Sequence, residues 1–107
     1  MRQSDLSRPE RDLVRVMQTI NFGRISLRVQ GGEPDQTQAW RTLRTVKLAT
    51  GSNGPRPEAR TADFELRAEQ VALLDQLSQL QDGTSVTIEV RHGLPFLIEI
   101  MQDHQVA

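Results

Sequence analysis

Few side chains along this 107-residue chain have the types and spacing that chemistry requires. There is no cysteine, and the only histidines are His92 and His104. Metal ions bind to clusters of His, Cys or carboxylate ligands, whereas these two histidines show no ligand spacing. The absence of cysteine also excludes a thiolate nucleophile and a disulfide framework. We therefore predict no metal site and no other cofactor.

The candidate catalytic side chains lack the motifs that would activate them. A nucleophilic hydroxyl needs an adjacent base, and no Gly-x-Ser-x-Gly turn surrounds Ser52 or Ser85. His92 falls in a predicted turn, where an exposed side chain is the simpler interpretation. Glu89 and Glu99 lie on the two strands of a predicted hairpin and could act as acid and base, but on a wet sheet face they more often only aid solubility. We predict that the protein is not an enzyme.

The stretch Gly51–Arg56 combines glycines, backbone donors and a cation, which are features of phosphate-binding loops. It lacks the Gly-Lys-Ser/Thr ending of a nucleotide-binding P-loop, and no obvious helix follows at once. A flexible linker is the favoured interpretation, and the Gly- and Pro-containing range 50–61 is assigned to it.

A group of five cations is the strongest candidate for a binding face. Two lie on the polar side of one predicted strand and three on the segment expected to pair with it: Arg24, Arg28, Arg41, Arg44 and Lys47. Such a ribbon could contact phosphates, and Trp40 among them could stack on a base. However, wet sheet faces are usually charged and aromatic residues make up only 4% of the chain, so a core position suits Trp40 better.

The net charge of −1 is divided unevenly along the chain. Residues 1–60 hold eleven Arg or Lys against six Asp or Glu, and residues 61–107 hold two against eight, giving about +5 and −6. The favoured interpretation is that the halves attract each other, within one fold or between subunits. Because two-unit sheets also have open edges, we predict a protein-interaction or self-association module, with a homodimer as the form that self-association would take. Nucleic-acid binding through the five cations is the alternative.

Helical and strand periodicities alternate along the chain. Ser7 and Glu10 have capping-box spacing, and the apolar residues that follow line one helical face until Gly23, which is expected to end the helix with a left-handed cap. Period-two alternation predicts a strand over 24–30. A turn and a second strand within 38–48 follow, but the register of that strand is open.

The second half repeats this order. A short extended piece at 63–66 leads to a helix over 67–81, which Gly83 is expected to end. A β-hairpin then spans 85–101 around the turn at 92–95. The remaining residues are expected to fray.

The two halves repeat the same pattern of apolar, glycine and proline positions. At an offset of sixty, the residues Leu13, Val14, Met17, Ile20 and Gly23 match Leu73, Leu74, Leu77, Leu80 and Gly83. At an offset of sixty-one, the residues Ile25, Leu27, Val29, Gly32 and Pro34 match Val86, Ile88, Val90, Gly93 and Pro95. We interpret the chain as repeat units at about 7–48 and 64–101 within a single domain, 1–107.

The predicted fold is α+β, with element order α-β-β-α-β-β. Two helix–hairpin units share one antiparallel sheet, and both helices pack on one face of it. The predicted core is Leu13, Val16, Met17, Ile20, Ile25, Leu27, Val29, Val71, Leu74, Leu77, Val86, Ile88, Val90, Phe96, Ile98 and Ile100.

The stretch Ile-Asn-Phe-Gly-Arg-Ile-Ser-Leu-Arg-Val at 20–29 resembles the small bacterial YezD-like proteins, in which a helix leads through a glycine into an amphipathic strand. The stretch 89–96 is similar. The resemblance covers about half of the chain, and implies a bacterial protein built from helix–hairpin units. This chain departs from that pattern by holding two units and the insert 51–60, and the family supplies no function to carry over.

The start of the sequence, residues 1–10, is polar and unlike a secretory signal. No apolar run approaches the roughly 20 residues that a membrane-spanning helix needs. Together with the lack of cysteine, these features lead us to expect a cytoplasmic protein that does not enter a membrane.

Overall fold

The structure is a computed structural model and describes residues 2–46, 48 and 66–102. Its elements, in chain order, are η1 (Gln3–Asp5), α1 (Arg8–Ile20), β1 (Gly23–Gln30), β2 (Glu33–Pro34), β3 (Arg41–Arg44), α2 (Ala68–Ser78), β4 (Ser85–Arg91) and β5 (Leu94–Met101). The predicted α+β class is therefore confirmed. The predicted linker 50–61 and the tail from 103 onward lie outside the described residues.

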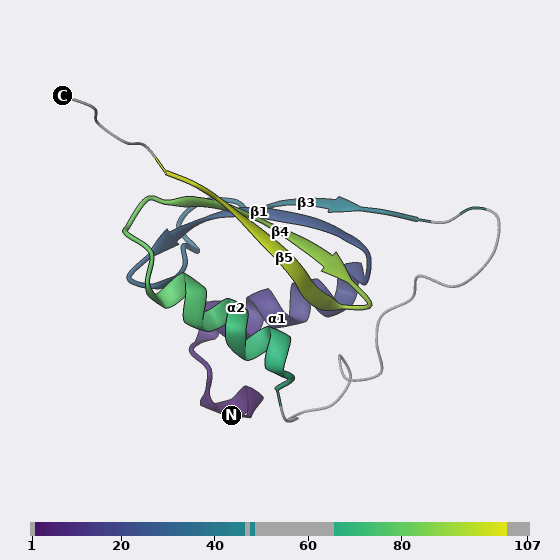
Figure 1. The fold of residues 1–107 in the computed structure, drawn as a ribbon, viewed down its shortest axis with the longest axis horizontal. Helices are drawn as coiled ribbons and strands as arrows, with labels where there is room; N and C mark the ends of the chain where they lie inside the picture. Colours follow the sequence, from purple (N-terminus) through teal and green to yellow (C-terminus); the bar gives the residue numbers. More distant parts are fainter. Residues whose placement is uncertain (1, 47, 49–65, 103–107) are drawn as a thin grey trace.

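All strand pairs in the described sheet are antiparallel, with the order β2-β1-β4-β5. β3 also pairs with β1, through residues whose other side already pairs with β4, so β3 lies along the same edge as β2. Figure 1 shows α1 and α2 on the same side of the sheet. The other side of the sheet carries no helix in the described part of the chain, and we call it the outer face.

Helix α1 begins as predicted and ends differently. The Ser7 N–H donates to Glu10 Oε1 over 2.9 Å and the Glu10 N–H donates to Ser7 Oγ over 3.4 Å, which completes the capping box. The residue that caps the end of α1 is Asn21 and not Gly23; its φ is positive, at 67°, but its ψ of −51° is not that of a left-handed cap. Gly23 begins β1, and its lack of a side chain lets the β3 backbone approach closely. An added Cβ would lie 1.9 Å from the Leu43 carbonyl oxygen.

Helix α2 is shorter than the predicted range 67–81, since it ends at Ser78. Gly83, with φ 86°, lies in the turn before β4 and does not end the helix. Neither helix of the described chain is long and apolar enough to cross a membrane.

The second strand of the first half is split, which explains why its register was open. β2 stops at Pro34 because the chain turns at Asp35, whose carboxylate accepts hydrogen bonds from the N–H and the hydroxyl of Thr37 over 2.9 and 2.6 Å. This is an Asx-type turn. The chain rejoins the sheet at Arg41 as β3. We call residues 35–40 the excursion.

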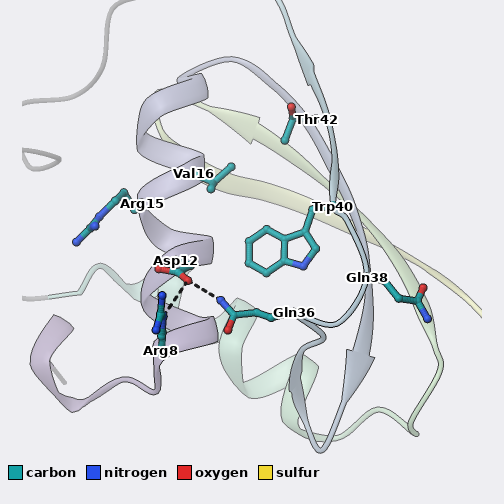
Figure 2. A pocket seen from close by; sticks show the side chains of 8 residues that line it. All are labelled: Arg8, Asp12, Arg15, Val16, Gln36, Gln38, Trp40 and Thr42. Carbon is teal, nitrogen blue, oxygen red and sulfur yellow. Dashed lines mark hydrogen bonds and ion pairs between the residues drawn. The ribbon is translucent and has the colours of Figure 1, made fainter.

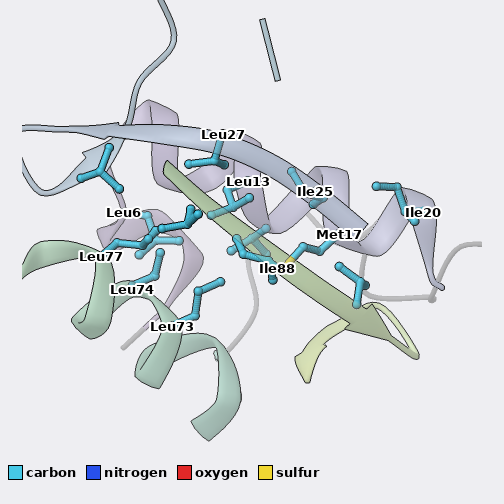
Figure 3. Packing of buried hydrophobic residues seen from close by; sticks show 14 of the residues in the cluster. Leu6, Leu13, Met17, Ile20, Ile25, Leu27, Leu73, Leu74, Leu77 and Ile88 are labelled. Carbon is cyan, nitrogen blue, oxygen red and sulfur yellow. The ribbon is translucent and has the colours of Figure 1, made fainter. Parts of the chain in front are cut away.

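One buried cluster lies between the helices and the sheet. Figure 3 shows the side chains of α1 and α2 pointing toward those of the central strands, among them Leu13, Met17, Leu73, Leu74, Leu77, Ile25 and Ile88. The cluster also contains residues missing from the predicted core, namely Leu6, Val14, Leu66 and Leu73. Val16, Val71 and Ile98 are only partly buried against it.

Two predicted core residues are wrong. Phe96 is 56% exposed and Ile100 is 39% exposed. Both belong to β5, which is at the edge of the sheet, and the β4–β5 register shifts at Glu89/Val90, next to Phe96. Alternation identified the faces of this strand, but an edge position and a bulge decide how much of each face is covered.

Candidate interaction surfaces

The structure places three of the five predicted binding cations on one face. Arg24 and Arg28 lie on the outer face, since the residues that alternate with them on β1 are buried. Arg41 is opposite Ser26 and therefore shares that face, whereas Arg44 is opposite Gly23 and lies on the other face. The four arginines are exposed. Lys47 lies outside the described residues.

Acidic groups lie close to these cations. Glu89 of β4 is directly opposite Arg24, although its carboxylate pairs with Arg91 at 3.4 Å. The hydrogen bonds from Thr37, and to a smaller extent the charge of Arg28, hold the pKa of Asp35 below its ordinary value. Of these two acids only Glu89 belongs to the acidic second half, and the β1–β4 pairing places it beside Arg24 of the basic first half within one fold.

Trp40 is separate from the outer-face cations. It is partly buried, and its indole Nε1 donates to the Asp35 carbonyl oxygen over 2.8 Å. The ring lies in a groove of about 620 Å³ between α1 and the segment 36–42 (Figure 2). We call this the Trp40 groove, and its lining is Arg8, Asp12, Arg15, Val16, Gln36, Gln38, Trp40 and Thr42.

Sequence reasoning did not assign Arg8 and Arg15 to a site. The available signal was their spacing of seven on the polar side of a well-defined helix, which places them on one face. What could not be foreseen was the excursion, because it brings Trp40 back over that helix. A split strand leaves no periodic pattern.

β5 presents an apolar exposed surface. Four of its eight residues are large, apolar and substantially exposed: Phe96 (56%), Leu97 (41%), Ile100 (39%) and Met101 (73%). Within the described residues β5 pairs with β4 alone, so its other edge is open. We call this the β5 edge. Leu97 and Met101 interrupt the polar side of the alternation, and that signal was present in the sequence.

Among the candidate catalytic residues that the structure describes, only the carboxylates of Glu89 and Glu99 are brought near each other. Glu89 is opposite Leu97, and Glu99 is opposite Thr87, so the two carboxylates are diagonal neighbours. His92 is exposed in the hairpin turn, and its ring meets the edge of Phe22 at 4.7 Å between centroids. Ser52, His104 and the loop 51–56 lie outside the described residues. Within the described chain, no three His, Cys, Asp or Glu side chains gather in a way that could hold a metal ion.

No protein-family model, no curated protein and no solved structure matches this chain. The resemblance to YezD-like proteins therefore stays a prediction, and the functional argument rests on the surfaces described above.

Proposed function

We propose that this chain is a non-catalytic interaction module that associates with a second copy of itself through the β5 edge. The observation that carries the proposal is the open edge of an eight-residue strand with four exposed apolar side chains. An open strand offers a row of backbone hydrogen-bonding groups to another strand. Glu99 is the one charged residue of β5, so the strand carries little charge that would repel a partner strand.

Symmetry restricts how two β5 strands can pair. Antiparallel pairing of a strand with its own copy places a two-fold axis at right angles to the sheet. One residue on that axis then lies directly opposite the same residue of the second copy. A pair centred on Glu99 would set like charges opposite each other, which is unfavourable. A pair centred on Ile98 instead sets Phe96 opposite Ile100 of the second copy, and Leu97 opposite its Glu99. We propose this register, which joins the two sheets and keeps all helices on one side.

We also infer that the two halves arose by duplication, with the units at about 7–48 and 64–101. The pairing of β1 with β4 supports this. At the offset of sixty-one, Ile25 corresponds to Val86 and Leu27 to Ile88. Exchanging each residue for its counterpart turns the pair Ile25↔Ile88 into the pair Leu27↔Val86, and both pairs occur. The centre of this local two-fold relation is the pair Ser26↔Thr87, whose hydroxyl oxygens are 3.2 Å apart.

The turns and helix starts also correspond. Gly31 and Gly32 have φ of 64° and 75°, and the equivalent His92 and Gly93 have φ of 55° and 73°. At each helix start a side chain three residues on accepts a hydrogen bond from the capping N–H: Glu10 from Ser7 and Gln70 from Arg67. An antiparallel contact between like strands thus already exists inside the chain, which makes a second one between chains physically reasonable.

Light scattering after size exclusion, over a range of concentrations, tests the association. The double variant Leu97→Lys/Met101→Lys puts two charges on the β5 edge at exposed positions, where substitutions change folding stability by about 0.5 kcal/mol or less. We expect a dimer from the wild type and at least a tenfold weaker dimer from this variant. The matched control is Leu43→Lys, on the opposite edge at 61% exposure. A wild type that stays monomeric, or a dimer that the double variant retains, contradicts the proposal.

The second candidate function is nucleic-acid binding by the outer face. It is favoured by the position of Arg24, Arg28 and Arg41 together on a face that no described helix covers. Changing all three to Ala should weaken binding to mixed-sequence DNA and flatten its salt dependence. Arg44→Ala is the matched control, because Arg44 lies on the other face. Equal losses in both variants would show that binding does not use the outer face.

The cellular setting is a proposal as well. The absence of cysteine supports a reducing compartment such as the cytoplasm.

A further inference from the structure

The Trp40 groove has an aromatic floor. Figure 2 shows the indole ring broadside within the groove, with Asp12 and Arg8 of α1 along one side and Gln38 on the other. Its volume of about 620 Å³ falls within the range of about 300–1,000 Å³ typical of small-molecule sites. An open aromatic face with polar groups around it is the arrangement that stacks a flat ring.

The indole is held in place before any ligand arrives. Its Nε1 is bound to the Asp35 carbonyl oxygen at 2.8 Å. Asp35 is itself fixed to β1, because its N–H donates to the Arg28 carbonyl oxygen over 2.8 Å, and its carboxylate accepts two hydrogen bonds from Thr37. A ring fixed in this way loses little conformational entropy when a ligand stacks on it.

The groove favours an anion modestly. It is lined by Arg8 and Arg15 against a single carboxylate, that of Asp12. Asp12 accepts a hydrogen bond from Gln36 Nε2, and the Arg8 contact to it is long, at 3.9 Å, with the Arg8 side chain 82% exposed. Arg8 is therefore weakly held, and in Figure 2 Arg15 extends away from the ring. Both long side chains can turn to meet an anionic group above the ring.

We propose that the Trp40 groove binds a flat aromatic ring that carries one anionic group, as in a nucleoside monophosphate. The ring stacks on Trp40 and the anion binds to Arg8 and Arg15. The ligand is either a free nucleotide or one unit of a single-stranded nucleic acid, which share this chemistry. The proposal does not depend on association through the β5 edge and uses none of its residues.

The test uses the fluorescence of Trp40, which is the one tryptophan of a chain without tyrosine, so the emission reports on the groove directly. AMP, adenosine, ribose 5-phosphate and a short oligodeoxyadenylate are titrated into the full chain, with excitation at the red edge of indole absorption. We expect saturable quenching by AMP. Adenosine and ribose 5-phosphate should each bind at least about tenfold more weakly, because each lacks one of the two recognised groups.

The variant Arg8→Ala/Arg15→Ala should bind AMP at least about tenfold more weakly. Arg11→Ala is the matched control, since Arg11 is exposed on the same helix but does not line the groove. Far-ultraviolet circular dichroism checks that each variant keeps its fold. If the oligonucleotide binds more tightly than AMP with the same arginine dependence, the ligand is a single strand; if AMP binds as well or better, it is a free nucleotide.

Three results would overturn the proposal. One is the absence of saturable quenching by both AMP and the oligonucleotide. Another is unchanged AMP affinity in Arg8→Ala/Arg15→Ala, or an equal loss in Arg11→Ala. The third is oligonucleotide binding that is abolished by changing Arg24, Arg28 and Arg41 but not by changing Arg8 and Arg15, which would place the ligand on the outer face.

Discussion

Truncating Ile88 should cost far more stability than truncating Ile100, although both are isoleucines on adjacent strands. Ile88 is fully buried in the centre of the sheet, opposite Ile25 on one side and Ile98 on the other. Ile100 is 39% exposed on β5. The pair therefore tests which strand is central and which is at the edge.

The magnitude follows from burial. Ile88→Ala removes buried methyl groups and leaves a cavity, which costs about 2–5 kcal/mol. Ile100→Ala removes atoms that solvent already reaches, and costs about 1 kcal/mol or less. With a urea dependence of about 1.5 kcal/mol per M for a small domain, these losses lower the unfolding midpoint by about 2 M and by about 0.5 M.

Urea titration followed by circular dichroism gives both midpoints. It is performed at low protein concentration, so that association through β5 does not protect Ile100. Equal midpoint shifts for the two alanine variants would refute the assignment of β4 as central and β5 as edge. Ile88→Asp goes further, because an unpaired charge in the core should prevent folding, and a cooperative transition near the wild-type midpoint would contradict the burial of this side chain.

Two other perturbations test the excursion and the strand that follows it. Gly23→Ala should displace β3 and lower the free energy of unfolding by about 1–3 kcal/mol, since its Cβ would meet the Leu43 carbonyl at 1.9 Å. Gly31→Ala has no atom within 4 Å of its Cβ, so it should cost only the left-handed backbone strain of about 1–2 kcal/mol. Crosslinking of β3 to β1 distinguishes the variants, because only Gly23→Ala should reduce it. The lowered pKa of Asp35 means that its ionised form stabilises the excursion at pH values above its ordinary pKa of 3.8 and that this stabilisation is lost as the pH falls through the lowered pKa. Acrylamide quenching of Trp40 should therefore rise only in acid, and Asp35→Asn, which keeps an acceptor oxygen but does not titrate, should lose this step.

The elements that were predictable are those fixed by local physics. The capping box at Ser7 and the alternation of 85–91 depend on neighbours within a few residues, and α1 and β4 appear where these patterns place them. The α+β class follows from such elements. Whether a strand is covered on its second edge depends on partners far along the chain, so the exposure of Phe96 could not be derived from alternation.

The candidate sites were harder to predict because they depend on register. Arg41 and Arg44 are three residues apart, and their faces were unknown until the pairing Ser26↔Arg41 was established. The sequence allowed two interpretations of Trp40, a base-stacking residue among the five cations or a core residue. The structure shows it at the margin of the core, in a groove. The cause is a single turn at Asp35, whose side-chain hydrogen bonds compete with continuation of the strand.

Both proposed surfaces come from the same point in the two units. At the offset of sixty-one, Pro34 corresponds to Pro95 and Asp35 to Phe96, and the strand is irregular at both places. In the first unit the chain leaves the sheet there, because Asp35 and Thr37 close a turn, and the excursion carries Trp40 over α1. In the second unit Phe96 offers no such hydrogen bonds, so the irregularity remains a register shift and β5 continues to Met101 as an open, apolar edge. On the proposed duplication, one irregular position after a proline lies at the origin of both the Trp40 groove and the β5 edge.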